Sequence, residues 1–589
     1  METIQLIIDN KEVEVPRGTT ILDAAKSVGI HIPTLCYMKL EDLHYENNPG
    51  ACRICVVEIE GRRNLAPSCK MECTEGMVVR THTPRVMNAR RTVMELILSN
   101  HPAECLTCSS NGHCELQKIA HDLGIREIRY KGEMSTFTID RSPSIVRNMN
   151  KCIMCRRCET MCNTIQTVGA LTAVNRGFNA AVSTAFERDM AGSTCSYCGQ
   201  CVSVCPVNAL SGRNTQQPVL DALADPTKIV IAQTAPAVRT ALGRDFGYEP
   251  GTLVTGKMVS ALRQLGFDYV FDTDFAADLT IMEEGTELLH RLGSYLNGDK
   301  EVKIPLMTSC CPGWVSFVEQ HFPELRDHLS TAKSPQQMFG AIAKSYFAEK
   351  LGVDRKDLVV VSIMPCLAKK YEASRPEFSV EGNPDVDYSI YTRELARLIR
   401  YANIDFNELP DGEFDRPLGE STGASVIFGT TGGVMEAALR TAVETLTGEE
   451  LASLDFNDVR GMEGIKEATY PVAGMEIKVA VASGLGNAKK LLEMVKSGER
   501  TYHFIEIMGC PGGCINGGGQ PQQPGYIRNT VDIRALRASV LYQSDKENPI
   551  RKSHENPAIK ELYETYLGEP GSEKAHHLLH TSYVKRTIN

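Results

Sequence analysis

Two stretches of the sequence, KCIMCRRCETMC at residues 151–162 and CSYCGQCVSVCP at residues 195–206, carry cysteines at the same spacing, C-x2-C-x2-C-x3-C. Each two-residue step is a tight turn, so three successive thiolates can hold three corners of one cubic 4Fe–4S cluster. The fourth cysteine of each run then reaches the cluster of the other run. The spacing predicts a double 4Fe–4S domain over residues 140–215.

The eight cysteines of these runs are shared between the two clusters. We expect the first cluster to take Cys152, Cys155, Cys158 and Cys205, and the second to take Cys195, Cys198, Cys201 and Cys162. Pro206 after Cys205 follows the pattern of two-cluster ferredoxins, whereas Asn163 departs from it. A structural zinc site is the alternative, but zinc normally uses one group of four ligands rather than two interlocked runs.

The first 80 residues have the order of a β-grasp 2Fe–2S ferredoxin domain. Apolar residues alternate over 4–8 and 13–15 around a turn, and Thr19 or Thr20 can cap a helix that follows. A loop with four cysteines comes next, and its expected ligands are Cys36, Cys52, Cys55 and Cys69. The first gap of 15 residues is longer than in plant ferredoxins.

Residues 84–122 look helical around a histidine and three cysteines, His101, Cys105, Cys108 and Cys114, and the domain that carries them is expected over residues 81–139. One imidazole among three thiolates predicts a 4Fe–4S cluster of raised potential. A helical histidine beside unrelated cysteines is the alternative. Cys73 is left without a role by these sets, so we expect a small buried hydrophobic residue there.

The bulk composition excludes several classes of protein. A length of 589 residues predicts several domains, and a net charge of −10 without a basic run argues against nucleic acid as a partner. No apolar stretch approaches the roughly 20 residues of a membrane span. The N-terminus lacks the pattern of a signal peptide. The odd number of 21 cysteines, mostly in tight groups, favours metal thiolates in a reducing cytoplasm over disulfides.

Apolar runs alternate with helical stretches over residues 225–545, which predicts an α/β domain with parallel strands. These runs are KIVIA, YVFD, LVVVSIMP, KVAVASG and FIEIMG. A polar stretch at 545–556 is expected to be a linker to a short helical tail, residues 546–589. The tail histidines have no cysteine or carboxylate at ligand spacing, so we expect packing rather than metal binding from His576, His577 and His580. The whole chain is therefore expected to be a multidomain α+β and α/β protein.

Three segments of the α/β domain carry the remaining cysteines: TSCCPGW at 308–314, MPCLAKKYE at 364–372 and EIMGCPGGCINGGGQP at 506–521. Each alone could hold buried core cysteines. Together they resemble the signature segments of the iron-only (FeFe) hydrogenases. With the cluster-rich residues 1–215, here called the arm, this resemblance covers nearly the whole chain. It implies a two-lobed α/β domain that binds an H-cluster, which is a 4Fe–4S cluster joined to an organometallic two-iron subsite.

The resemblance implies roles for individual residues. The 4Fe–4S part of the H-cluster would be held by Cys311, Cys366, Cys510 and Cys514, of which Cys514 would also bridge to the two-iron subsite. Lys369 would donate a charge-assisted hydrogen bond to a cyanide ligand. The pocket wall would consist of Pro236, Gln336, Met364 and Met508. Ala237 stands where some relatives carry serine, which implies one hydrogen bond fewer to the cluster.

A proton path is also implied. Cys310 precedes a ligand, and a thiol with a reference pKa of about 8.5 can exchange protons near neutrality. Glu284, Glu287 and Arg291 lie on one face of a predicted helix, and a solvated helix face is the alternative reading of that pattern. In the resembled family the matching positions, with Ser330 between the glutamates, pass protons from solvent to the cysteine.

The implied activity is the reversible oxidation of molecular hydrogen to protons and electrons. The proton couple lies at roughly −410 mV at pH 7, close to the value of about −400 mV for plant-type ferredoxin clusters. A non-catalytic electron-transfer or iron–sulfur assembly relative would have lost H-cluster cysteines or pocket methionines. A hydrogen sensor would have lost the proton-carrying cysteine and gained a PAS-type domain. Neither change is seen in this sequence.

The layout is similar to the catalytic subunit of multisubunit NAD(P)-linked or electron-bifurcating hydrogenases, with the tail resembling their small-subunit domain. No G-x-G-x-x-G follows a strand, and the glycine-rich FGTTGGVME at 428–436 matches the hydrogenases rather than a dinucleotide loop. A nicotinamide reaction would therefore need a separate flavoprotein subunit near the 2Fe–2S domain. The implied partners also include a small 2Fe–2S subunit, ferredoxin and the maturation enzymes. The cofactors are one 2Fe–2S cluster, three 4Fe–4S clusters and the H-cluster.

Overall fold

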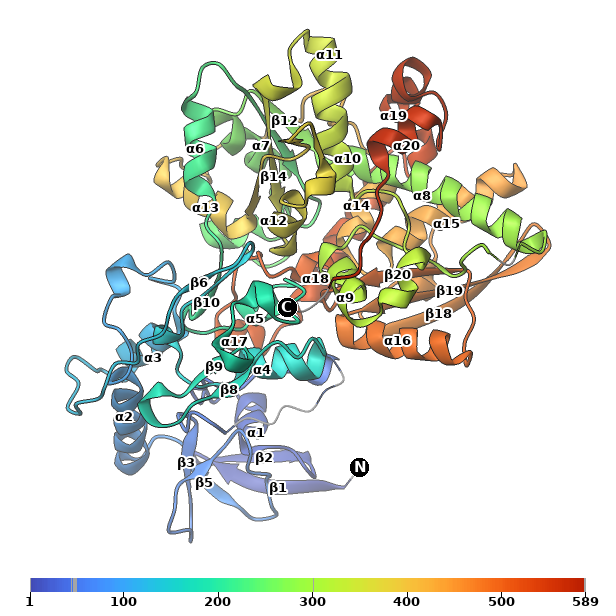
Figure 1. Ribbon diagram of the computed structural model, residues 1–589. Helices are drawn as coiled ribbons and strands as arrows, with labels where there is room; N and C mark the ends of the chain where they lie inside the picture. Colours follow the sequence, from blue (N-terminus) through green and yellow to red (C-terminus); the bar gives the residue numbers. More distant parts are fainter. Residues whose placement is uncertain (1, 44, 46–49, 300, 587–589) are drawn as a thin grey trace.

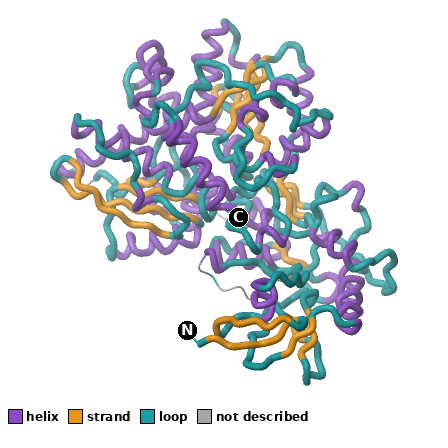
Figure 2. The backbone as a smooth tube through the Cα atoms, turned by 180° about the vertical axis from the view of Figure 1, so that it is seen from behind, coloured by secondary structure: helices purple, strands orange, loops and turns teal. Residues whose placement is uncertain are grey.

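The computed structural model describes residues 2–43, 45, 50–299 and 301–586, so the ends of the outer domains at 1 and 587–589 lie outside the described part. The arm, coloured blue to teal in Figure 1, lies against one side of the α/β domain. Seen from behind in Figure 2, the strands of the α/β domain form separate groups with helices around them. The chain is thus multidomain, with mixed helix and strand, as expected.

The N-terminal hairpin forms as the alternation of apolar residues predicts. Asp9 and Asn10 have φ angles of 48° and 67° in its turn, which matches the twist of the strands. Thr20 caps α1 (Ile21–Ser27) because its side chain accepts a hydrogen bond from the Asp23 N–H. The sheet has the order β2-β1-β5-β3-β4 and is built from β1 (Thr3–Ile8), β2 (Lys11–Pro16), β3 (Val56–Ile59), β4 (Ala66–Pro67) and β5 (Val78–Arg80).

The rest of the arm consists of short elements around the cysteines. α2 (Pro84–Leu98) and α3 (Glu115–Asp122) flank the loop that carries His101. Each C-x2-C run enters a one-turn helix, α4 (Arg157–Thr160) or α5 (Gln200–Ser203), as expected for near-repeats. Five short strands complete this region: β6 (Asp140–Arg141), β7 (Ile145–Arg147), β8 (Thr172–Val174), β9 (Ala181–Ser183) and β10 (Leu210–Gly212).

The first lobe of the α/β domain is built on a parallel sheet of order β12-β11-β14-β17. Its strands are β11 (Ile229–Thr234), β12 (Tyr269–Asp272), β14 (Leu358–Met364) and β17 (Tyr388–Tyr391). One face is covered by α6 (Gln216–Ala224), α7 (Thr255–Gln264) and α13 (Thr392–Tyr401), and the other by α8 (Thr273–Leu296) and α10 (Pro335–Ile342).

The second lobe has a sheet of order β13-β20-β19-β18, in which only β18 runs antiparallel to its neighbour. Its strands are β13 (Leu306–Met307), β18 (Ile465–Val472), β19 (Met475–Ser483) and β20 (Phe504–Met508). Its two faces pack against α15 (Gly433–Thr447) and α16 (Leu485–Ser497). α8 also packs on the α15 side, so it touches the cores of both lobes.

The polar stretch 545–556 is not the expected linker. α18 (Ile533–Glu547) runs into it, and Asp545 is fully buried against Arg440, whose Nη1 donates to Asp545 Oδ1 at 2.8 Å. Asn556 is also buried and donates to Asp278 Oδ2 at 2.9 Å. The prediction was wrong because these polar side chains have buried partners far away in the sequence. Their polarity therefore does not indicate exposure to solvent.

The C-terminal tail is helical at first, as predicted, with α19 (Pro557–Leu562) and α20 (Glu573–Leu579) packed on the first lobe. After α20 the tail runs across the molecule without a helix or strand, and Figure 1 draws it as a dark red tube. The Lys333 N–H donates to Leu579 O and the Thr581 N–H donates to Thr331 O, both at 2.8 Å. No helix in the described residues is long and apolar enough to cross a membrane.

Candidate metal centres and proton relay

The two C-x2-C runs fold into two cavities, and each is lined by cysteines of both runs. One cavity is lined by Cys152, Cys155, Cys158 and Cys205, and the other by Cys162, Cys195, Cys198 and Cys201. These are the two exchanged sets that the spacing predicts. Burial raises the pKa of Cys155 to about 12, so such thiols become thiolates readily only when a metal displaces the proton. The donors fit 4Fe–4S clusters.

The four cysteines of the β-grasp domain also converge. Cys55 Sγ donates to Cys69 Sγ at 3.3 Å, and Cys36 is hydrogen-bonded with Cys52 and Cys69. The Gly50 N–H donates to Cys36 Sγ at 3.4 Å. This is a compact set of four sulfurs of the kind that holds a 2Fe–2S cluster.

Cys73 lies apart from this set in the core of the same domain. Its side chain is buried among apolar residues, and burial raises its pKa to about 11. The expected role as a small buried hydrophobic residue is confirmed.

His101 has the protonation state and the free nitrogen that a metal ligand needs. Burial, with Lys151 nearby, lowers the pKa of His101 to about 4, so the imidazole is neutral. Its Nδ1 is buried and has no hydrogen-bond partner among the described residues. Cys105 and Cys108 raise the pKa of Cys114 electrostatically, so the three thiols lie near one another. This donor set fits a cluster with one histidine ligand.

The groups of cysteines adjoin one another from the arm to the α/β domain. Cys114 Sγ lies 3.6 Å from the carbonyl of Pro206, the residue after Cys205. At the other end, Cys198 interacts electrostatically with Cys311 and Cys510 of the α/β domain. The sulfurs therefore form a continuous series of neighbouring groups.

Four cysteines of the α/β domain meet where strands of both lobes end. Cys311 precedes α9 (Pro312–His321), Cys366 follows β14, and Cys510 and Cys514 follow β20. Burial raises the pKa of each of the last three thiols, and the neighbouring sulfurs raise it further. The carboxyl ends of parallel strands are where α/β folds place their ligands.

Glycines allow the loop after β20 to approach these sulfurs. A Cβ on Gly509 would lie 3.2 Å from Cys311 Sγ, and the Gly509 N–H donates to that sulfur at 3.4 Å. Gly513 has a φ of 100°, and a Cβ there would lie 2.7 Å from the Thr431 nitrogen. Gly513 therefore needs glycine, whereas at Gly509 a side chain would crowd the sulfur of Cys311. The loop is therefore shaped to place backbone directly against a cluster.

Lys369 and Gln336 share a buried carboxylate, Glu372. The Lys369 ammonium donates to Glu372 Oε2 at 2.9 Å and to the Cys310 carbonyl at 3.0 Å. Gln336 Nε2 donates to the same carboxylate oxygen at 2.9 Å. Burial opposes the charge of Lys369, but Glu372 outweighs it and raises the pKa. The ammonium thus remains charged beside the cysteines.

Glu372 was missed from the sequence, although it lies in the quoted MPCLAKKYE segment three residues after Lys369. The other pocket positions are buried: Pro236 follows β11, Met364 ends β14 and Met508 ends β20. Ala237 is fully buried as well, and its carbonyl accepts a hydrogen bond from Gln520 Nε2 at 2.8 Å. Each methionine stands two residues before a cysteine of the site, Cys366 or Cys510.

Three residues of the expected proton path, Glu284, Glu287 and Arg291, lie on α8, and Ser330 lies beside them. Ser330 Oγ donates to Glu287 Oε2 at 2.9 Å and is also hydrogen-bonded with Glu284. Arg291 Nη2 donates to Glu287 Oε1 at 2.6 Å. Burial and the neighbouring Glu287 raise the pKa of Glu284 to about 8. Burial and the charge of Glu284 raise the pKa of Cys310 well above its usual range.

The tail covers this path, which the sequence does not reveal. Tyr583 OH donates to the Ser330 carbonyl at 2.8 Å. His580 is not merely a packing residue: its Nε2 lies 2.9 Å from Glu283 Oε2 and its Nδ1 lies 2.8 Å from Thr331 Oγ1. These partners are 249 to 297 residues away, so no local pattern could have indicated them. His576 stacks on the ring of His580, but His576 and His577 are both exposed, so the expectation that they are packing residues was wrong.

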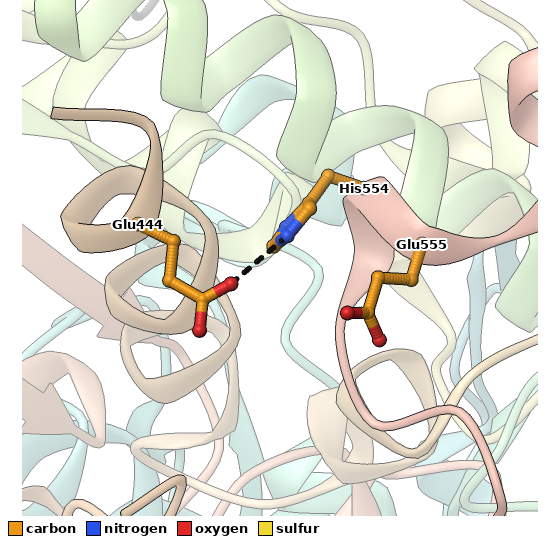
Figure 3. A group of neighbouring side chains, drawn as sticks. All are labelled: Glu444, His554 and Glu555. Carbon is orange, nitrogen blue, oxygen red and sulfur yellow. Dashed lines mark hydrogen bonds and ion pairs between the residues drawn. The ribbon is translucent and has the colours of Figure 1, made fainter. Parts of the chain in front are cut away.

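A second group of potential metal ligands lies near the tail. His554 Nε2 is 3.1 Å from Glu444 Oε2, and Glu555 points toward the same space (Figure 3). Lys552 Nζ lies 3.0 Å from Glu444 and 3.3 Å from Glu555, so an ammonium already balances these carboxylates. The group is an ion-pair cluster.

Models of known protein families match successive parts of the chain. "Iron only hydrogenase large subunit, C-terminal domain" matches residues 228–518 and "Iron hydrogenase small subunit" matches 531–586. In the arm, a "2Fe-2S iron-sulfur cluster binding domain" matches 1–84, an "NADH-ubiquinone oxidoreductase-G iron-sulfur binding region" matches 90–129, and a "4Fe-4S dicluster domain" matches 140–209.

Individual proteins are similar over the full length. The chain is 61% identical to the NADP-reducing hydrogenase subunit HndD of Solidesulfovibrio fructosivorans over 100% of both chains. It is 40% identical to iron hydrogenase 1 of Clostridium pasteurianum over 99% of this chain and 100% of that protein. Among solved structures, apo [FeFe]-hydrogenase HydA1 of Chlamydomonas reinhardtii superposes with a TM-score of 0.56 and 47% identity, over 63% of this chain and 98% of HydA1.

Proposed function

Because the chain belongs to the iron-only (FeFe) hydrogenase family, we propose how its own residues divide the work of reversible hydrogen oxidation. The protein is a hydrogenase that carries an H-cluster together with 2Fe–2S and 4Fe–4S clusters. When bound, the H-cluster interconverts one hydrogen molecule with two protons and two electrons. The protein must hold this cluster, move the protons and conduct the electrons.

The first task falls to the cysteines at the ends of the strands. We propose that the H-cluster is held by Cys311, Cys366, Cys510 and Cys514. The charged ammonium of Lys369, fixed by Glu372, offers a hydrogen-bond donor to an anionic ligand in the same pocket. Buried Pro236, Gln336, Met364 and Met508 supply walls that exclude water.

The second task is proton transfer, for which Cys310 Sγ holds the proton nearest the H-cluster. The proton passes between this sulfur and Glu284, then through the hydroxyl of Ser330 to Glu287 and out along Arg291. The observation that supports this proposal most strongly is that the hydroxyl of Ser330 is hydrogen-bonded with both carboxyls. A carboxyl whose pKa is raised to about 8 can both accept and donate a proton near neutrality.

The third task is conduction through the arm. From the site of Cys311, electrons would pass to the cluster held by the set that contains Cys198. They would then pass to the cluster held by the set that contains Cys205. Cys114 of the histidine-ligated set lies near Pro206. Buried Arg157 interacts with both Cys155 and Cys36, which brings the 2Fe–2S set close to the same cluster. Both outer clusters can therefore exchange electrons with the set of Cys205.

For the remaining partners we propose a multisubunit complex in the cytoplasm. A flavoprotein subunit that binds NADP, as the name of the HndD relative suggests, would exchange electrons with the 2Fe–2S domain. A small 2Fe–2S subunit, ferredoxin and the maturation enzymes complete the partners. The domain division at residues 1–80, 81–139, 140–215, 225–545 and 546–589 belongs to the same proposal.

A gas assay tests the function. The matured chain, mixed with hydrogen and oxidised viologen, should consume hydrogen, and with reduced viologen it should release it. A chain with full iron content that does neither would favour the non-catalytic alternative. A hydrogen sensor would show weak turnover, but the presence of Cys310 argues against this alternative.

A further inference from the structure

One glutamine, Gln166, crosses the junction between the arm and the α/β domain. It follows the π-helical turn Met161–Ile165 that contains Cys162, and its side chain is fully buried. π-Helical turns are rare and are frequent at functional sites. The backbones also touch here, since a Cβ on Gly486 would lie 2.3 Å from the carbonyl oxygen of Ile165. The junction therefore leaves little room for the glutamine to move.

Every polar atom of this side chain has a partner. Gln166 Nε2 donates to the Gly509 carbonyl at 2.6 Å and to the sulfur of Cys198. Its Oε1 accepts from the Leu485 N–H at 2.9 Å, which satisfies the first amide of α16. The Gly509 N–H in turn donates to Cys311 Sγ at 3.4 Å. A line of hydrogen bonds thus joins Cys198, Gln166, Gly509 and Cys311.

We propose that Gln166 is a positioning residue that couples the H-cluster to the cluster held by Cys198. When bound, a cluster held by Cys198 would gain one negative charge on taking up one electron, without any bond being made or broken. The Nε2–H of Gln166 donates to the sulfur of Cys198, so it would stabilise the reduced state and raise the potential of that cluster. The contacts with Gly509 and Leu485 hold the two clusters at one separation. The proposal rests on the ligand assignments above.

The test uses the matured full-length protein and two leucine variants. Gln166→Leu keeps the side-chain volume and removes the amide. The control is Gln522→Leu, because Gln522 Nε2 also bridges the two domains. It donates to the Val202 carbonyl at 2.8 Å and to the Cys205 carbonyl at 3.5 Å, which are backbone acceptors instead of a thiolate. A potentiometric titration followed by electron paramagnetic resonance monitors the Cys198 cluster, identified as the signal lost in Cys198→Ala. Isotope exchange between dihydrogen gas and water measures the chemistry at the H-cluster, which needs no net electron transfer through the arm.

In Gln166→Leu we expect the potential of this cluster to fall, so that the equilibrium constant for its reduction drops about tenfold, as for one charge-assisted hydrogen bond. Viologen-linked turnover should fall, while isotope exchange stays at the wild-type rate. Gln522→Leu should leave the potential unchanged. An unchanged potential in Gln166→Leu, or an equal shift in Gln522→Leu, would overturn the role of Gln166.

If Gln166→Leu loses its clusters, Gln166→Met serves instead. Methionine keeps an unbranched side chain without adding a charge but cannot donate to Cys198, so the potential should still fall; an unchanged value would overturn the proposal. Failure of Cys198→Ala to remove any 4Fe–4S signal would overturn the ligand assignment, and the role of Gln166 with it. If the wild-type protein catalyses isotope exchange, hydrogenase function itself stands and only the ligand assignment has failed.

Discussion

At the scale of single residues, we propose that the reaction depends on Cys310, a thiol that is not one of the proposed metal ligands. Cys310 stands beside the proposed ligand Cys311 and interacts with Glu284. We expect Cys310→Ala to retain its iron and lose turnover by roughly 100-fold to 10,000-fold, the usual contribution of a general acid–base group. Iron content and hydrogen uptake measure the two effects. Cys73→Ala, in the core of the β-grasp domain, is the control and should turn over normally. Near-normal turnover of Cys310→Ala would reject the relay.

Glu284 makes stability depend on pH. Burial raises its pKa from 4.5 to about 8, so the folded state favours the protonated carboxyl. This contribution to stability is complete below the unfolded pKa and is lost as pH rises through 8. In Glu284→Gln the group cannot ionise, so the variant should gain stability relative to wild type between pH 5 and 8, by at most about 1.4 kcal/mol per pH unit. Melting temperatures across this range test it, and a difference that does not change with pH would contradict it.

The residues of the site differ in how far the sequence could predict them. Cysteine spacing indicates the cluster sets in the arm because C-x2-C geometry is local. The proposed H-cluster cysteines can be predicted only through family resemblance, since they lie on separate segments of the chain. Tyr583 and Gln166 leave no signal, because their contacts span 253 and 343 residues. Only folding brings such partners together.

At the scale of elements, the extended end of the tail lies on the segment that carries Ser330. Tyr583→Phe removes one hydrogen bond to the Ser330 carbonyl, worth about 1 kcal/mol. We expect turnover about fivefold lower, with a larger solvent isotope effect, because proton transfer becomes slower while the clusters are unchanged. Tyr566→Phe is the control, since the ring of Tyr566 packs at a tilt against Tyr346 and no residue of the proposed relay. Equal isotope effects in both variants would show that the tail does not position the relay.

The elements that the sequence predicts are those with strong local patterns. Buried strands such as β14 are continuous apolar runs and were correctly predicted. β13 has only two residues, and β18 alternates in burial at the edge of its sheet, so neither carries such a run. The wrongly predicted linker at 545–556 shows the converse case, in which buried ion pairs give a core segment a polar sequence.

At the scale of the whole molecule, the chain should depend on a partner for nicotinamide. The amides of Gly432 and Met435, in the glycine-rich stretch 428–436, both donate to the Glu506 carboxylate at 2.7 Å. A carboxylate therefore fills the place that a phosphate takes in a dinucleotide loop. The purified chain should reduce viologen or ferredoxin with hydrogen but not NAD(P). Direct reduction of NAD(P) by the chain alone would contradict this.

The proposed function depends most on the convergence of Cys311, Cys366, Cys510 and Cys514 from two lobes on one H-cluster. Infrared spectroscopy of the matured protein tests this most directly, because the resembled family carries carbon monoxide and cyanide on its two-iron subsite. We predict bands from metal-bound CO and CN⁻ in the wild type and their loss in Cys514→Ala. A fully iron-loaded wild-type protein without these bands would contradict the account.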